Sequence, residues 1–104
     1  MDEKRQKIEK DMLEQLKNQE VKGEHYKDLV RDYMALWDIK NALIKDIEEK
    51  GVSIKYKNGK DQWGYKKNDS VPELNKVSAQ MLKILSELGL KPSPIGNDDN
   101  DFIL

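Results

Sequence analysis

The feature that most constrains the fold is a long amphipathic stretch over residues 24–49. Apolar side chains recur there with the period of a helix and cover about half of the cylinder. They are Tyr26, Leu29, Val30, Tyr33, Met34, Leu36, Trp37, Leu43, Ile44 and Ile47. This face is wider than one helix–helix contact uses, so the helix is expected to pack against two neighbours, one of which could be a second copy of the chain.

A homo-oligomer is expected for a second reason, which is size. Residues 24–91 number 68, and a domain below about 70–80 residues rarely obtains more than a few kcal/mol from one core. The candidate interface residues are Tyr33, Trp37, Lys40, Ile44 and Ile47. Lys40, near the middle of the face, can lay its stem along apolar surface or form an ion pair with another subunit.

Elements on either side of this helix complete the predicted fold. Residues 3–20 read as a polar helix whose apolar stripe is thin, so this helix needs a partner surface to persist. A last helix is expected over Val71–Leu88, where Ser70 and Glu73 have the spacing of a capping box.

Between these two long helices the period changes from 3.6 to 2. Residues 52–56 alternate as a strand does, and residues 62–65 would return as a second strand. Asn58-Gly59 between them tolerates the positive φ of a tight hairpin turn. The fold class is therefore mainly α: a small helical domain with a long central helix, a β-hairpin and a C-terminal helix, assembling as an oligomer. Its parts are a polar N-terminal helix (1–23), a helix–hairpin–helix core (24–92) and a disordered acidic tail (93–104) with an apolar tip, Phe102-Ile103-Leu104.

Positive charge gathers on the hairpin although the chain as a whole has a net charge of −1. Residues 50–67 hold six lysines against a single aspartate, with Tyr56, Trp63 and Tyr65 among them. Lysines interleaved with aromatics on a β-ribbon suit contact with DNA phosphates and bases. Alternatively, the lysines protect an exposed strand edge and the aromatics pack onto the helices; at least one of Trp63 and Tyr65 is expected to pack in the core. The candidate DNA-binding residues are Lys55, Lys57, Lys60, Lys66 and Lys67.

Catalysis and metal binding are not expected. The chain has no cysteine, which excludes disulfides and thiolate sites. Its single histidine, His25, makes no ligand set, because metal sites need three or four convergent ligands. Phosphate-binding loops and hydrolase motifs are missing, so neither an enzyme nor a cofactor is predicted. No apolar run approaches the ~18 residues of a membrane span, and we expect a soluble, intracellular protein with no membrane partner.

The last helix and its approach carry a resemblance to a known family. The run from Lys67 to Leu90 (KNDSVPELNKVSAQMLKILSELGL), together with Leu36-Trp37-Asp38 and the turn Tyr56-Lys57-Asn58-Gly59, resembles the small subunit of a tailed-bacteriophage terminase. The resemblance covers about residues 26–92.

Membership of that family implies a non-catalytic component of genome packaging in the host cytoplasm. Small terminase subunits recognise double-stranded viral DNA, assemble as rings or other oligomers and serve a large subunit that carries the ATPase and nuclease. The resemblance favours DNA contact by the lysine hairpin, and the apolar tip Phe102-Ile103-Leu104 is a candidate for docking on the large subunit. Two other functions stay open: a purely structural oligomerisation adaptor and a small transcription regulator.

Overall fold

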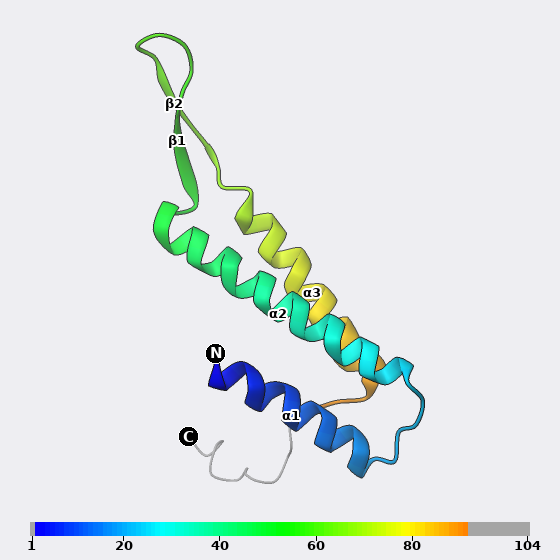
Figure 1. Ribbon diagram of the computed structural model, residues 1–104. Coiled ribbons are helices and arrows are strands. Elements are labelled where there is room, and N and C mark those ends of the chain that lie inside the picture. Colours follow the sequence, from blue (N-terminus) through cyan, green and yellow to red (C-terminus); the bar gives the residue numbers. More distant parts are fainter. Residues whose placement is uncertain (1, 92–104) are drawn as a thin grey trace, which may run out of the picture.

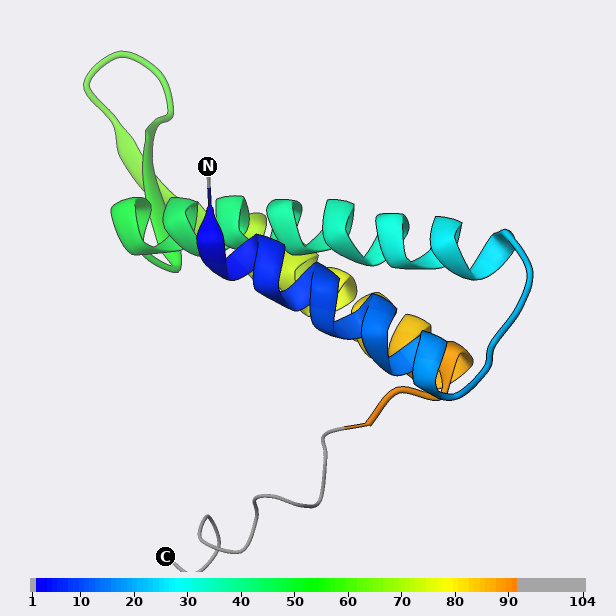
Figure 2. The same cartoon turned by 60° about the horizontal axis from the view of Figure 1, so that its bottom comes forward.

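The structure, a computed structural model, describes residues 2–91 and is mainly helical, as predicted. Its elements in chain order are α1 (Glu3–Asn18), α2 (His25–Lys50), β1 (Ser53–Lys57), β2 (Trp63–Lys67) and α3 (Ser70–Leu88). Helices α2 and α3 run antiparallel side by side, and the hairpin that joins them projects beyond their shared end (Figure 1). Helix α1 lies beneath the half of α2 that begins at His25 (Figure 2).

Helix α2 has two neighbours, as the width of its apolar face predicts, and both belong to the same chain. It packs along α3 for much of its length and against α1 near its beginning (Figures 1 and 2). The side chains that α2 buries, Val30, Met34 and Trp37, all lie in its first half. The width of the face is therefore used within one chain, and assembly of several chains stays a prediction.

One apolar core joins all three helices. Met12 and Leu16 of α1 are buried in it, and Leu16 has no exposed surface. The thin stripe of α1 thus finds its partner surface on α2 and α3, and the core spans the predicted boundary at residue 23. The buried apolar side chains are Met12, Leu16, Val30, Met34, Trp37, Val77, Met81, Leu88 and Leu90.

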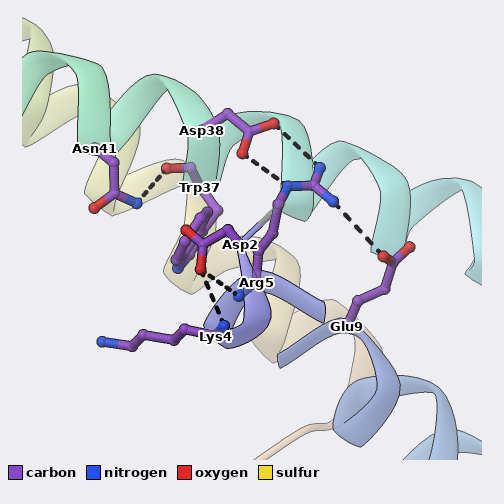
Figure 3. A network of polar contacts seen from close by, with 7 residues as sticks. All are labelled: Asp2, Lys4, Arg5, Glu9, Trp37, Asp38 and Asn41. Carbon is purple, nitrogen blue, oxygen red and sulfur yellow. Dashed lines mark hydrogen bonds and ion pairs between the residues drawn. The ribbon is translucent and has the colours of Figure 1, made fainter. Parts of the chain in front are cut away.

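Polar contacts fix the beginning of α1 against the middle of α2 (Figure 3). The Asp2 carboxylate caps α1 by accepting from the backbone N–H groups of Lys4 and Arg5 at 3.0 and 3.2 Å. The Arg5 guanidinium then donates twice to Asp38 of α2, at 2.8 and 3.1 Å, and lies 3.7 Å from Glu9. The hydrogen bond to Asp38 raises the pKa of Arg5. A two-pronged contact of this kind sets orientation as well as distance.

The hairpin forms as predicted, with Asn58-Gly59 in its loop, and each strand begins one residue later than the sequence indicates. The strands pair Lys57 with Trp63, which leaves five residues, 58–62, in the loop. The backbone N–H of Asn58 donates to the carbonyl of Gln62 at 2.7 Å, and positive φ angles fall at Gly59 and Asp61. A two-residue turn at Asn58-Gly59 would place Lys57 opposite Lys60, a repulsive pair that the five-residue loop avoids.

The predicted capping box at the start of α3 is wrong. Ser70 is the first residue of the helix, and its hydroxyl donates to Asp46 of α2 at 2.8 Å instead of serving the backbone of Glu73. The amide oxygen of Asn68 accepts from the Ser70 N–H at 2.9 Å and takes over the capping role. The Ser70 hydroxyl therefore bonds to Asp46, which is distant in sequence, and not to the nearby backbone of Glu73.

Candidate nucleic-acid interface

The strand register sorts the predicted lysines onto different faces of the hairpin. Directly paired residues share a face, and successive residues alternate between faces. Lys55 pairs with Tyr65 and Lys57 with Trp63, so these four residues lie on one face together with Lys67. We call the set Lys55, Lys57, Trp63, Tyr65 and Lys67 the lysine–aromatic face. Of the other two candidates, Lys66 belongs to the opposite face and Lys60 to the loop.

Both aromatics of this face are open to solvent. Trp63 is 57% exposed and Tyr65 is 70% exposed, so the expectation that at least one of them packs in the core is wrong. The reason is the position of the hairpin, which extends past the ends of α2 and α3, where no helix lies beside its outer part (Figure 1).

The opposite face is arranged differently. Tyr56 pairs with Gly64, and a Cβ atom added at that glycine would lie 3.2 Å from the tyrosine ring. The ring therefore lies on the glycine backbone. Tyr56 retains less exposure, 38%, than the two aromatics of the lysine–aromatic face.

Lysine ammonium groups lie near aromatic rings on both faces. The Lys55 Nζ is 4.8 Å from the centroid of the Trp63 ring, and the Lys66 Nζ is 6.0 Å from that of Tyr56. Both distances are within the ~6 Å range of a cation–π contact. The rings thus position cations on a strand pair that has few other contacts.

Polar groups tie the base of the hairpin to the helices. The buried Asn68 donates from Nδ2 to an Asp46 carboxylate oxygen at 3.1 Å and to the Gly51 carbonyl at 2.9 Å. Its backbone N–H donates to the Val52 carbonyl at 2.8 Å. With the Ser70 contacts above, these bonds join the end of α2 to the start of α3. We call the Asp46, Asn68 and Ser70 side chains with the Gly51 carbonyl the hairpin anchor.

Hydrogen bonding keeps Asp46 ionised. The Ser70 hydroxyl, the Lys50 ammonium at 3.0 Å and the Asn68 amide together lower the pKa of Asp46. The anchor depends on the ionised form of Asp46. Protonation of this carboxylate at acid pH should therefore weaken the anchor.

The hairpin anchor is a feature that was not predicted from the sequence. One signal was present, because the run Asn68-Asp69-Ser70 consists of residue types that bond to nearby backbone at helix starts. Nothing in that run points to Asp46, which lies 24 residues before Ser70.

The predicted interface residues lie in two settings along α2. Trp37 is buried in the core of the single chain, and Tyr33 packs against that core, where burial raises the pKa of its phenol. Lys40, Ile44 and Ile47 are half-buried, towards the hairpin end of the helix. The interface stays a prediction.

Two other predicted features are placed as follows. The tip Phe102-Ile103-Leu104 lies outside the described residues. His25 is the exposed first residue of α2, and residues 2–91 contain no cluster of three or more histidine or carboxylate side chains arranged to hold a metal ion. None of the helices in this range contains an apolar stretch of the length that a membrane span requires.

Comparison with known proteins agrees with the resemblance noted in the sequence. The model of a family described as phage terminase, small subunit, matches residues 6–96 and so includes most of α1 as well as the rest of the described fold. A search of curated proteins and a search of solved structures found no match. The family model covers most of the length of this chain, and the chain therefore belongs to the phage terminase small subunit family.

Proposed function

We propose that this protein is the non-catalytic DNA-binding subunit of a phage terminase, which recognises double-stranded viral DNA and regulates the large ATPase and nuclease subunit during packaging. Family membership supports the packaging role. The observation that carries DNA binding is the lysine–aromatic face, where three lysines and two exposed aromatics share one side of a projecting β-ribbon.

The geometry of this face suits a polyanion. Lys55 and Lys57 are two residues apart on β1, about 6.8 Å along the strand, and Lys67 extends the charge onto β2. A two-stranded ribbon is narrow enough to enter the major groove. Because the hairpin extends past the helices (Figure 1), these ammonium groups can reach phosphates without a clash from the helical part.

Self-association would strengthen such binding, and we include a homo-oligomer, as a ring, in the proposal. Large apolar side chains remain exposed on the helices, with Ile39 at 47% and Leu82 at 67%. Ile44 and Ile47 of α2 are half-buried and keep part of their apolar surface open. Repetition of the hairpin around an axis would turn one small basic patch into a band. Light scattering at tens of micromolar, a range that detects ordinary specific contacts, tests this part, and a monomeric mass would contradict it.

The test of DNA binding is the dependence of affinity for duplex DNA on salt concentration. Each phosphate contact contributes about 0.9 to the slope of log affinity against log salt. The triple variant K55A/K57A/K67A should lower the slope by about one per lysine for each engaged copy and weaken all sequences alike. A matched triple variant on α1, K4A/K7A/K10A, removes the same charge and should leave the slope unchanged.

Two results would redirect the proposal. If only the α1 variant lowered the slope of log affinity against log salt, the DNA would bind to α1 and not to the hairpin. No salt-dependent affinity in the unaltered protein would favour a structural adaptor that binds protein only. Oligomer mass and helical content are checked in each variant, so that a folding defect is not mistaken for lost binding.

The large subunit is the second proposed partner. We propose that the tip Phe102-Ile103-Leu104, which follows an acidic stretch, docks on it. Deleting residues 93–104 should abolish co-purification with the large subunit and leave DNA affinity intact. Unchanged co-purification would refute the docking role.

A further inference from the structure

We infer that Trp63 and Tyr65 stack on bases, so that the hairpin prefers DNA containing unpaired bases to an intact duplex. The inference rests on the proposed DNA binding through the lysine–aromatic face. It adds that the target is DNA whose bases are accessible, and it assigns two base-contacting residues.

The first support is exposure. Trp63 and Tyr65 are 57% and 70% exposed on neighbouring positions of one face, although aromatic side chains of this size usually bury most of their surface. The other tryptophan of the chain, Trp37, is buried in the core. Aromatic faces beside a basic track are the usual means of holding single-stranded nucleic acid, because every base has a face that can stack.

The second support is the pairing of each ring with a lysine. Trp63 is directly opposite Lys57, and Tyr65 is directly opposite Lys55. The face therefore repeats one unit twice, a ring that can take a base and an ammonium group that can take the adjoining phosphate. Lys55 also lies 4.8 Å from the Trp63 ring centroid, which places its charge next to both units.

The third support is spacing. Positions 63 and 65 are about 6.8 Å apart along the strand, whereas neighbouring bases in a stacked strand are about 3.4 Å apart. One base can fit between the two rings, or each ring can take one base. Either arrangement requires a base to leave the stack of its neighbours, which costs least where bases are already unpaired.

The opposite face provides an internal contrast. Its aromatic, Tyr56, lies on Gly64 and is the least exposed of the three hairpin aromatics. Its single lysine, Lys66, lies 6.0 Å from that same ring. This face offers no second ring and no second lysine, so the stacking function is confined to the lysine–aromatic face.

The experiment compares three DNA probes of one sequence, bound by the full chain at one salt concentration: a duplex, a duplex with a central run of unpaired bases, and a single strand. We expect tighter binding to both probes with unpaired bases. W63A and Y65A should each weaken those two probes about 5-fold to 150-fold, the factor expected for one stacked base, and weaken the duplex less. W63F and Y65F keep an aromatic ring and should retain most of the preference.

Tryptophan fluorescence supplies a readout that is independent of affinity. The chain has two tryptophans, so subtracting the spectrum of W63F leaves the emission of Trp63. Stacking should quench this emission with the unpaired probes, while the buried Trp37 reports that the fold is intact.

The outcomes separate the inference from the proposed function. Equal affinity for all three probes, unchanged in W63A and Y65A, would overturn the inference, and loss of binding in K55A/K57A/K67A would still uphold the function. If the protein preferred the duplex and W63A abolished this preference, the stacking inference would be overturned. Trp63 would then insert into a groove of the duplex. Failure of the unaltered protein to bind any probe would overturn both.

Discussion

The two ends of this molecule are stabilised in different ways. At the helical end, where α1 meets α2 and α3, apolar side chains such as Leu16, Val30 and Met34 are almost fully buried. At the hairpin end, the buried group is the polar Asn68, and the aromatic side chains of the strands are exposed to solvent. One end is held by the hydrophobic effect and the other by a few directed hydrogen bonds.

This difference separates stability from binding. Substitutions in the core should change the folded fraction without altering the chemistry of the lysine–aromatic face. Substitutions on that face should change binding without altering stability, because surface replacements away from special contacts usually cost less than about 0.5 kcal/mol. The hairpin anchor is the exception, since it belongs to the fold and also orients the face.

Replacing Leu16 with alanine should produce the largest loss. The side chain has no exposed surface, and truncation of a buried leucine costs about 2–5 kcal/mol through lost transfer energy and a cavity. Chemical denaturation measures the change, and L82A serves as the control because Leu82 is 67% exposed. Equal effects of L16A and L82A would contradict the placement of the core at the helical end.

Replacing Asn68 with alanine should have the next largest effect, about 1–3 kcal/mol, because the Gly51 carbonyl and the Ser70 N–H lose their partner. The hairpin should also lose its fixed direction, which amide hydrogen exchange at β1 and β2 would detect. Asn75 is exposed on α3, and N75A is the matched control. Unchanged exchange in N68A would show that the anchor does not orient the hairpin.

Acid should weaken the hairpin end through Asp46. Hydrogen bonds from Ser70, Lys50 and Asn68 hold its pKa below the ordinary value of 3.8. The stabilisation is therefore fully present above that value and is lost as pH falls through the lower folded-state pKa. D46N keeps an acceptor oxygen but not the charge. The stability difference between the unaltered protein and D46N should be constant near neutrality and shrink below about pH 4; a difference that stays constant at lower pH would refute the coupling.

The smallest effect is expected from Arg5. Its contact with Asp38 is two-pronged but partly exposed, so R5A should destabilise less than N68A, and the loss should decline as salt rises. R31A is the control, since the Arg31–Asp28 pair lies within α2 and is more exposed. A double-mutant cycle with D38A isolates the pair, and no coupling energy would mean that the contact does not hold α1.

The sequence predicted the helices well because their signals are local. The apolar period of residues 24–49 places α2 to within one residue of its observed bounds, His25–Lys50. The family could be recognised from the residues before and along α3. Each short segment there is a weak match to the family, but the segments follow one another in the order that the family has.

The errors at the hairpin end arise because non-local contacts decide the structure there. Ser70 looks like a cap until Asp46 is brought beside it. Alternation shows that Trp63 lies on one face of a strand, yet it does not show whether a helix covers that face.

The register of the hairpin has a consequence for how such a protein can diverge. Adding or removing a residue in the loop, residues 58–62, leaves the pairing of Lys57 with Trp63 intact. One residue inserted between Trp63 and Tyr65 would instead move the tryptophan to the opposite side of the ribbon, because the side-chain period is two. Insertions and deletions are therefore tolerable at the tip and disruptive within the strands, even though most residues of both segments are exposed.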